Sequence, residues 1–202
     1  MSKEAVGEPV RKEEIRHFVR MRRCELDAVW IGQKSLAAQQ QVTELPEFKK
    51  AKVVCCYLAM ENEVRTDRLL DRCWKEEKTV CVPAFCRKTG KYRLSGIKKD
   101  TPVIEGHWKV WEPAHIQWIA VDKVDLIVVP GMAFDASGGR LGHGGGHYDQ
   151  ILGGRKSKLR CFKVGLAFDF QVFRSVPMGK NDVRMDVVVT EKQVLRSDGI
   201  AS

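Results

Sequence analysis

Five short apolar runs limit the folds open to this chain more than any other feature of it. They span residues 52–60, 79–83, 124–130, 163–168 and 187–190, and valine recurs in all of them. Runs of this length are short for helices, and their continuous apolar character is typical of strands buried on both faces of a sheet. We therefore expect five core strands, with residues 187–190 forming the last strand of the chain.

A helix is predicted between the first two runs. Thr66 and Asp67 can cap its start, and the side chains with helical spacing that we expect on its inward face are Leu69, Leu70, Cys73 and Trp74. A strand, a helix and a second strand within about thirty residues form a βαβ unit, whose strands run parallel. The predicted fold class is α/β: a mostly parallel, open twisted sheet between two layers of helices, with residues 92–97 able to form an edge strand.

The N-terminal quarter is predicted to be helical. Apolar residues recur at helical spacing over residues 11–30, which indicates one amphipathic helix, and residues 35–41 indicate a second, short one. The polar face of the first helix carries Lys12, Arg16, Arg20 and Arg23. Lys12 and Arg16 are four residues apart, so they lie on one side and could bind the same anion, although a solvated basic face would show the same pattern.

Length and composition predict one soluble domain over residues 1–202, with flexible termini at residues 1–10 and 196–202. No run approaches the roughly 20 apolar residues of a membrane span, and residues 1–9 lack the features of a targeting signal, so we expect a cytoplasmic protein without a membrane partner. Seven cysteines without a Cys-x-x-Cys pair predict reduced, mostly buried thiols. The net charge of +9 fits a polyanionic partner: nucleic acid, ATP or a polyglutamylated substrate.

The glycine-rich segment at residues 140–149 is the strongest functional feature. It follows the strand predicted at residues 124–130, and residues 148–152 can begin a helix. Exposed backbone N–H groups and a helix N-terminus both favour an anion. Arg140 can bind phosphate oxygens, and Asp149 offers a hard oxygen ligand for Mg²⁺. A nucleotide phosphate site is therefore predicted, although the segment matches neither a P-loop nor the dinucleotide fingerprint.

Several motifs together resemble the 5-formyltetrahydrofolate cyclo-ligase family, also called methenyltetrahydrofolate synthetases. They are VPGMAFD at residues 129–135, RLGHGGGHYD at 140–149, Lys12-x-x-x-Arg16, YLAMENEVRT at 57–66, Trp108-x-x-x-Glu112-Pro113 and NDVRMD at 181–186. The resemblance runs from Lys12 to about Thr190. It implies ATP- and Mg²⁺-dependent cyclisation of 5-formyltetrahydrofolate to 5,10-methenyltetrahydrofolate, with release of ADP and phosphate.

The resemblance also implies roles for individual residues. The catalytic cations would be Arg140 and Lys12, and the Mg²⁺ ligands Asp149 and Asp182. ATP would be bound by Lys12, Arg16, Arg140, Gly142, His143, Gly144, Gly145, Gly146, His147 and Tyr148. The folate, with or without a polyglutamate tail, would be bound by Tyr57, Leu58, Met60, Glu63, Phe85, Trp108, His147 and Tyr148. A monomer that binds no nucleic acid is expected.

Three loop positions depart from some members of the family. His143 stands where animal members carry arginine, Gly145 where they carry lysine, and His147 where tyrosine is common. The loop thus lacks two cations, which predicts weaker phosphate binding or a charge on His143 only at lower pH. A zinc pair formed by His143 and His147 is an alternative, as is a divalent cation site at Asp182 and Asp186.

A different class of function also fits the basic composition. A non-catalytic nucleotide- or RNA-binding module on the same fold would bind RNA in a salt-sensitive way. Mg²⁺, ATP and 5-formyltetrahydrofolate, mixed with the protein, would then leave the absorbance of the methenyl product unchanged. Joint retention of Lys12, Arg140, Asp149 and Asp182 argues for the enzyme, because RNA binding does not require that set.

Overall fold

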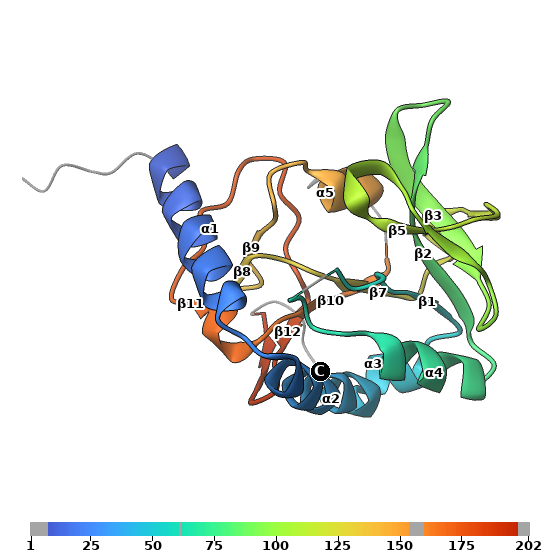
Figure 1. Cartoon of the computed structure of the whole chain (residues 1–202), viewed down its shortest axis with the longest axis horizontal. Helices are drawn as coiled ribbons and strands as arrows, with labels where there is room; N and C mark the ends of the chain where they lie inside the picture. Colours follow the sequence, from blue (N-terminus) through green and yellow to red (C-terminus); the bar gives the residue numbers. More distant parts are fainter. Residues whose placement is uncertain (1–7, 61, 154–159, 198–202) are drawn as a thin grey trace, which may run out of the picture.

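A computed structural model describes residues 8–60, 62–153 and 160–197 of the chain. Its main sheet has eight strands (Figure 1). In spatial order they are β13 (Val194–Arg196), β12 (Val187–Val189), β10 (Phe162–Leu166), β7 (Leu126–Val129), β1 (Val53–Cys55), β2 (Thr79–Cys86), β3 (Lys91–Ile97) and β6 (Trp118–Ile119). The five strands from β12 to β2 run parallel, and antiparallel strands extend the sheet at both ends. The predicted α/β class is confirmed.

In the described residues, two smaller sheets and eight helical segments accompany the main sheet. One small sheet joins β11 (Val172–Phe173), β8 (Ala133–Asp135) and β9 (Arg140–Leu141), and the other joins β4 (Val103–Glu105) and β5 (Trp111–Pro113). The α-helices are α1 (Glu8–Cys24), α2 (Ala28–Glu44), α3 (Pro46–Lys50), α4 (Asp67–Lys75) and α5 (His147–Ile151). The 3-10 helices are η1 (His107–Lys109), η2 (Val121–Lys123) and η3 (Asp169–Gln171). No helix in the described ranges is long and apolar enough to cross a membrane.

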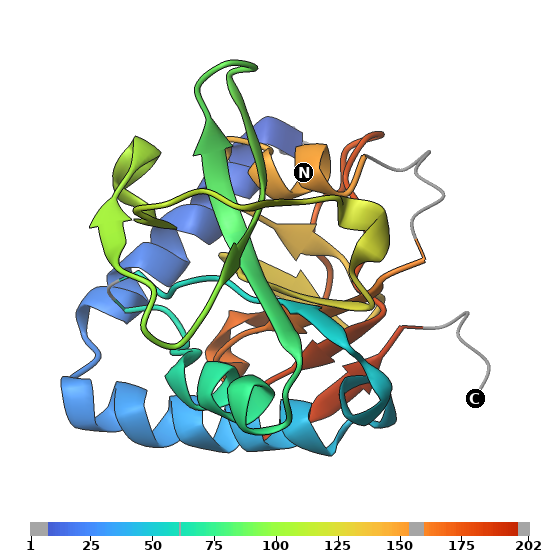
Figure 2. The same cartoon turned by 90° about the vertical axis from the view of Figure 1, so that its right-hand side faces the viewer.

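The central strands are buried on both faces, as their composition predicts. Val54 and Val128 are fully buried in the core under α2, α3 and α4, which lie together on one side of the sheet (Figure 1). Cys55 and Ile127 are fully buried on the opposite side, where the core includes Ile151 of α5. Figure 2 shows α2 along one edge of the molecule and the β2–β3 hairpin rising beyond the opposite one.

The prediction of one helix over residues 11–30 is wrong, because two helices meet there. α1 ends at Cys24 and α2 begins at Ala28, so the short helix predicted at residues 35–41 is part of α2. Asp27 separates the two helices, since its Oδ1 accepts hydrogen bonds from the N–H groups of Val29 and Trp30, both at 2.8 Å. The helical spacing continues across this junction, but an N-cap requires a non-helical backbone at Asp27.

Three strand predictions also change. Only Val53–Cys55 of the run at 52–60 forms a strand. The predicted helix cap at Thr66 is not formed, because the Thr66 hydroxyl donates to Tyr57 O at 2.6 Å instead. β3 is not an edge strand, because β6 pairs with its far side. β12 is not the last strand, because β13 pairs antiparallel with it.

The remaining fold predictions vary in outcome. The predicted inward side chains of α4 are buried except Trp74, which is partly buried. Six of the seven cysteines are buried, and all are free thiols. Of the termini predicted to be flexible, residues 8–10 belong to α1 and Arg196 ends β13, whereas residues 1–7 and 198–202 lie outside the described ranges.

α1 packs away from the main sheet, against β8 and its neighbours. Ile15 is buried in a small cluster with Ala133, Leu141 and Val176. Lys12 lies three residues before Ile15, and Arg16 lies one residue after it. The packing of Ile15 against Leu141 therefore brings both cations close to β9 and the glycines that follow it. The amphipathic pattern of α1 thus positions charge as well as burying apolar surface.

Asp27→Ala should weaken the junction of α1 and α2. The variant loses two hydrogen bonds to the first turn of α2, so we expect a loss of about 1 kcal/mol in the free energy of unfolding. Urea denaturation followed by circular dichroism measures it. Asp122→Ala is the control, because Asp122 is exposed and makes no side-chain interaction within the described residues. Equal stability of the two variants would contradict the capping role.

Asp135→Asn should destabilise the turn between β8 and β9 in a pH-dependent way. Burial alone raises the pKa of Asp135, but hydrogen bonds from Ser137, Val176 and Gly139 outweigh it and lower the pKa below its ordinary value. A lowered pKa contributes stability above the unfolded-state value and loses it as pH falls through the folded-state value. We expect Asp135→Asn to lose about 2 kcal/mol at neutral pH and the difference from wild type to shrink below about pH 4.

The measurement is thermal or urea unfolding of both proteins across that pH range. Asp122→Asn is the matched control and should follow the wild-type curve. A difference that does not change with pH would show that the charge of Asp135 is not what stabilises the turn.

Candidate functional site

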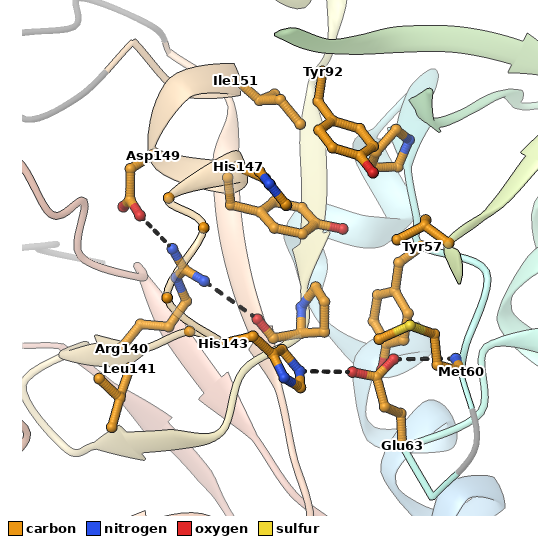
Figure 3. Close-up of a pocket in the computed structure, with 18 of the residues that line it drawn as sticks. Tyr57, Met60, Glu63, Tyr92, Arg140, Leu141, His143, His147, Asp149 and Ile151 are labelled. Atoms are coloured by element: carbon orange, nitrogen blue, oxygen red, sulfur yellow. Dashed lines mark hydrogen bonds and ion pairs between the residues drawn. The ribbon is translucent and has the colours of Figure 1, made fainter. Parts of the chain in front are cut away.

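A pocket with a volume of about 270 Å³ lies beside the carboxyl ends of β1 and β7 (Figure 3). Parallel strands place the loops that follow them at one edge of a sheet, and ligands of α/β folds bind there. The walls are completed by α1, the β8–β9 hairpin, α5, the segment before β12, and residues of β2, β3 and β5. The lining residues are Lys12, Arg16, Tyr57, Leu58, Met60, Glu63, Pro83, Tyr92, Val110, Trp111, Pro130, Arg140, Leu141, Gly142, His143, Gly144, Gly145, Gly146, His147, Tyr148, Asp149, Ile151 and Asp182.

The glycine-rich loop forms one wall and exposes its backbone. Gly144 and Gly146 have φ angles of 116° and 62°, which side chains other than glycine rarely adopt. Within the described ranges, the backbone N–H groups from Gly142 to Gly146 donate no hydrogen bond. Arg16 Nε donates to Gly142 O at 3.0 Å and so fixes the loop to α1. The loop therefore offers several free donors to an anion.

Two cations of the pocket are paired with carboxylates. Arg140 Nη2 donates to Asp149 Oδ2 at 2.8 Å, and Lys12 Nζ lies 3.6 Å from Asp182 Oδ2 (Figure 3 shows the first pair). The Arg140 side chain is 5% exposed, and its Nε has no hydrogen-bond partner in the described ranges. The side chain of Lys12 is 21% exposed. Two cations, each balanced by a carboxylate, thus lie in the same pocket as the free amides of the loop.

The opposite wall is apolar and aromatic. Tyr57 is buried and donates from its hydroxyl to Val64 O at 2.7 Å. Burial raises the pKa of Tyr57 and of Tyr148 well above the ordinary value, so both phenols stay neutral. The Arg140 guanidinium lies 5.7 Å from the Tyr148 ring centre. This wall can hold a flat ring while Arg140 faces a charged group.

The histidines of the loop have different surroundings. Burial lowers the pKa of His147, and the charges of His107 and His143 lower it further, so His147 is neutral at neutral pH. Its ring lies 4.5 Å from that of Tyr92. His143 is about half exposed, with Nε2 3.5 Å from Glu63 Oε1. His147 therefore adds a ring rather than a cation to the pocket.

Two residues from the predicted folate set do not line the pocket. The Phe85 ring stacks on His107 at 4.0 Å, and Trp108 is 71% exposed. Tyr92 and Trp111 line it instead. Tyr92 pairs with Phe85 in the β2–β3 register, and burial raises its pKa to about 12. The only sequence signal for Trp111 was its place beside Trp108 in an aromatic pair next to proline.

The two carboxylates predicted to bind Mg²⁺ face the same pocket from different segments. Asp149 Oδ1 accepts from Val183 N at 3.1 Å, which ties α5 to the segment that carries Asp182. Mg²⁺ is usually held by one or two carboxylates together with water and phosphate oxygens, so this pair suits it. Asp186 instead pairs with Lys163, at 2.7 Å from its Nζ, and the alternative site at Asp182 and Asp186 is not formed.

The zinc alternative gains no support. No group of three or more His, Cys, Asp and Glu side chains in the described residues is arranged to hold a metal ion. A catalytic zinc site usually has three protein ligands. Among the described residues, no third ligand accompanies His143 and His147.

Known proteins resemble this chain over almost its whole length. The family model of the 5-formyltetrahydrofolate cyclo-ligases matches residues 8–191. A probable 5-formyltetrahydrofolate cyclo-ligase of Schizosaccharomyces pombe is 35% identical over 180 residues, covering 83% of this chain and 88% of the relative. A 5-formyltetrahydrofolate cyclo-ligase of Haemophilus influenzae is 31% identical over 183 residues, covering 89% of this chain and 97% of that relative.

A solved structure agrees with the sequence matches. The 5,10-methenyltetrahydrofolate synthetase of Aquifex aeolicus superposes with a TM-score of 0.80 at 34% identity, covering 95% of each chain. Fold, order of motifs and sequence identity therefore all point to one group of ligases. The chain belongs to the 5-formyltetrahydrofolate cyclo-ligase family.

Proposed function

We propose that the protein catalyses the ATP- and Mg²⁺-dependent cyclisation of 5-formyltetrahydrofolate to 5,10-methenyltetrahydrofolate, with release of ADP and phosphate. Family membership supports the reaction. The observation that carries the proposal is a single pocket that combines free loop amides, the buried Arg140 and the partly buried Lys12 and Arg16 with an aromatic wall. One half suits a triphosphate, and the other half suits a flat heteroaromatic ring.

The chemistry needs positioning more than acid–base groups. The formyl oxygen is a poor leaving group, so in the proposed reaction it attacks the γ-phosphorus of ATP and ADP departs. N10 of the folate then attacks the activated formyl carbon, and phosphate leaves. Negative charge moves toward the β–γ bridge oxygen in the first step, where fixed cations and amides stabilise it. We assign that role to Lys12 and Arg140, because both residues line the pocket.

The remaining assignments follow the two halves of the pocket. Arg16, together with the loop amides, would bind the phosphates. The folate would contact Tyr57, Leu58, Met60, Glu63, His147 and Tyr148, all of which line the pocket. Phe85 and Trp108 are left out of the proposed folate site, because neither faces it. The cytoplasmic location and the monomeric state stay predictions.

Asp149 and Asp182 would hold Mg²⁺, which supplies charge neutralisation on the phosphates when bound. Each carboxylate is paired with a cation of the pocket. We propose that Lys12 and Arg140 would bind the phosphates, and that the carboxylates they leave would hold the metal ion. This exchange of partners keeps every buried charge matched.

Arg140→Ala should lower kcat by about 100- to 1000-fold, because it removes a fixed donor from the developing charge. Lys12→Ala should act in the same direction. The near-ultraviolet absorbance of the methenyl product, recorded with ATP, Mg²⁺ and 5-formyltetrahydrofolate, measures the rate. Arg174→Ala and Arg11→Ala are matched controls, since both side chains are exposed. Full activity of Arg140→Ala would reject its role, and an inactive wild type would favour the non-catalytic binding module.

Asp149→Asn and Asp182→Asn should each raise the Mg²⁺ concentration needed for half-maximal rate by about tenfold or more, because an amide binds Mg²⁺ more weakly than a carboxylate. A chelator should abolish wild-type turnover, and added Mg²⁺ should restore it. Asp122→Asn should keep the wild-type Mg²⁺ dependence. An unchanged metal requirement in both site variants would place the metal elsewhere.

A further inference from the structure

Arg23 is a buried cation that the pocket does not use directly. The charge pattern of α1 predicted it on the polar face, yet it is 8% exposed and is not among the lining residues. Its Nη2 donates to Gly131 O at 3.0 Å, and its Nη1 lies 3.8 Å from Glu63 Oε1. Burying a guanidinium is costly unless it is paired. Arg23 therefore requires an explanation beyond solubility.

Glu63 is the only carboxylate that Arg23 approaches in the described residues. It is 3% exposed and lines the pocket, with Oε2 accepting from Met60 N at 3.2 Å. Among the residues that the structure describes, its Oε1 has no hydrogen-bond partner, although His143 Nε2 lies 3.5 Å away (Figure 3). A buried acceptor without a donor suits a ligand that brings an N–H group.

Glu63 lies between two cavities, although its neighbour Val64 is buried in the core. A second cavity of about 620 Å³ also borders Leu58, Met60 and Glu63. Asn62 has a φ angle of 62°, which places this turn outside helix and strand geometry. A carboxylate between two cavities keeps one orientation only if something holds it. In the described residues that restraint comes from Met60 N, from Arg23 and, on the side of the pocket, from His143 Nε2.

Arg23 is itself held by a rigid part of the core. Gln171, which is fully buried, donates from Nε2 to Gly131 O at 2.8 Å and to Met132 O at 3.0 Å. Gly131 O thus accepts from both Gln171 and Arg23. The guanidinium therefore connects the backbone after β7 with the buried carboxylate of Glu63.

We propose that Arg23 is a positioning residue that holds the Glu63 carboxylate so that Oε1 accepts a hydrogen bond from an N–H group of the folate. This inference rests on the proposed function and extends it to a residue outside the pocket. Arg23 acts on folate binding through Glu63, and in the described part of the chain no hydrogen bond or ion pair joins it to a residue assigned to ATP.

The test compares Arg23→Met with Arg22→Met. Met keeps the length of the side chain but removes the charge, and Arg22 is a neighbour whose exposed side chain pairs with Glu25 at 2.9 Å. We expect Arg23→Met to raise KM for 5-formyltetrahydrofolate about tenfold or more, with KM for ATP unchanged. Arg23→Lys, which keeps the charge, should recover part of the loss. Arg22→Met should match wild type in both constants.

A double-mutant cycle with Glu63→Gln separates positioning from general destabilisation. Folate binding is measured by calorimetry without ATP, and the melting temperature is measured in parallel. If Arg23 acts through Glu63, Arg23→Met/Glu63→Gln binds folate no more weakly than Glu63→Gln, and it melts above Arg23→Met because no buried charge is left unpaired. Additive effects on folate binding would overturn the proposal.

The remaining outcomes are also decisive. If wild type binds folate and folded Arg23→Met binds it equally well, the proposal fails while the proposed function stands. If Arg23→Met does not fold, a double variant that folds and binds like Glu63→Gln supports the proposal, and one that does not fold overturns it. If wild type binds no folate and shows no turnover, the proposed function fails, and the proposal fails with it.

Discussion

Parallel pairing of strands that are buried on both faces is the constraint on which the rest of this structure depends. β1 lies between β2 and β7, and Val54, Cys55 and Ile127 are fully excluded from water. Neither face of these strands can carry polar chemistry, because an unpaired polar group there would be costly. The functional side chains are therefore confined to the loops at the carboxyl ends, where the segments around residues 57–63 and 130–131 converge.

The glycine-rich loop reaches this edge through a short hairpin. Met132 N donates to Leu141 O at 2.7 Å, and Asp135 accepts hydrogen bonds that close the turn between β8 and β9. Arg140 Nη1 consequently lies 3.5 Å from the carbonyl oxygen of Pro130, the residue that follows β7. The loop can expose its amides because the hairpin, rather than the loop itself, provides the rigidity. α1 adds Arg16 from the other side.

Charge balance is the second property that unites the site. Lys12 and Arg140 are each matched with a carboxylate, and Arg23 is matched with Glu63. Such pairs allow cations to be buried before any substrate arrives. Under the proposed function they also couple ATP to Mg²⁺, since a phosphate that takes the cation leaves a carboxylate that requires another positive partner. The loop positions at His143 and Gly145 add no fixed cation, so α1 and β9 supply most of the positive charge.

Local sequence patterns predicted which helices and strands form better than they predicted the residues at which these begin and end. The strand in the run after Lys52 ends at Cys55, although the apolar pattern continues. The apparent helix across Asp27 is two helices, because the Asp27 side chain accepts hydrogen bonds from the first turn of α2. Phe85 and Trp108 show a related limit. Their residue types suit a folate pocket, but strand register and the backbone of η1 determine which side each ring faces.

The sequence by itself determined the α/β class, the glycine-rich loop and the resemblance to the cyclo-ligase family, because these depend on residue type and on short spacings. Only the tertiary structure decided which charges meet. Arg23 and Gly131 are separated by 108 positions in the chain, and Arg16 and Gly142 by 126. No local propensity encodes such contacts. They follow from the packing of α1 on β8 and β9, which is a property of the folded chain as a whole.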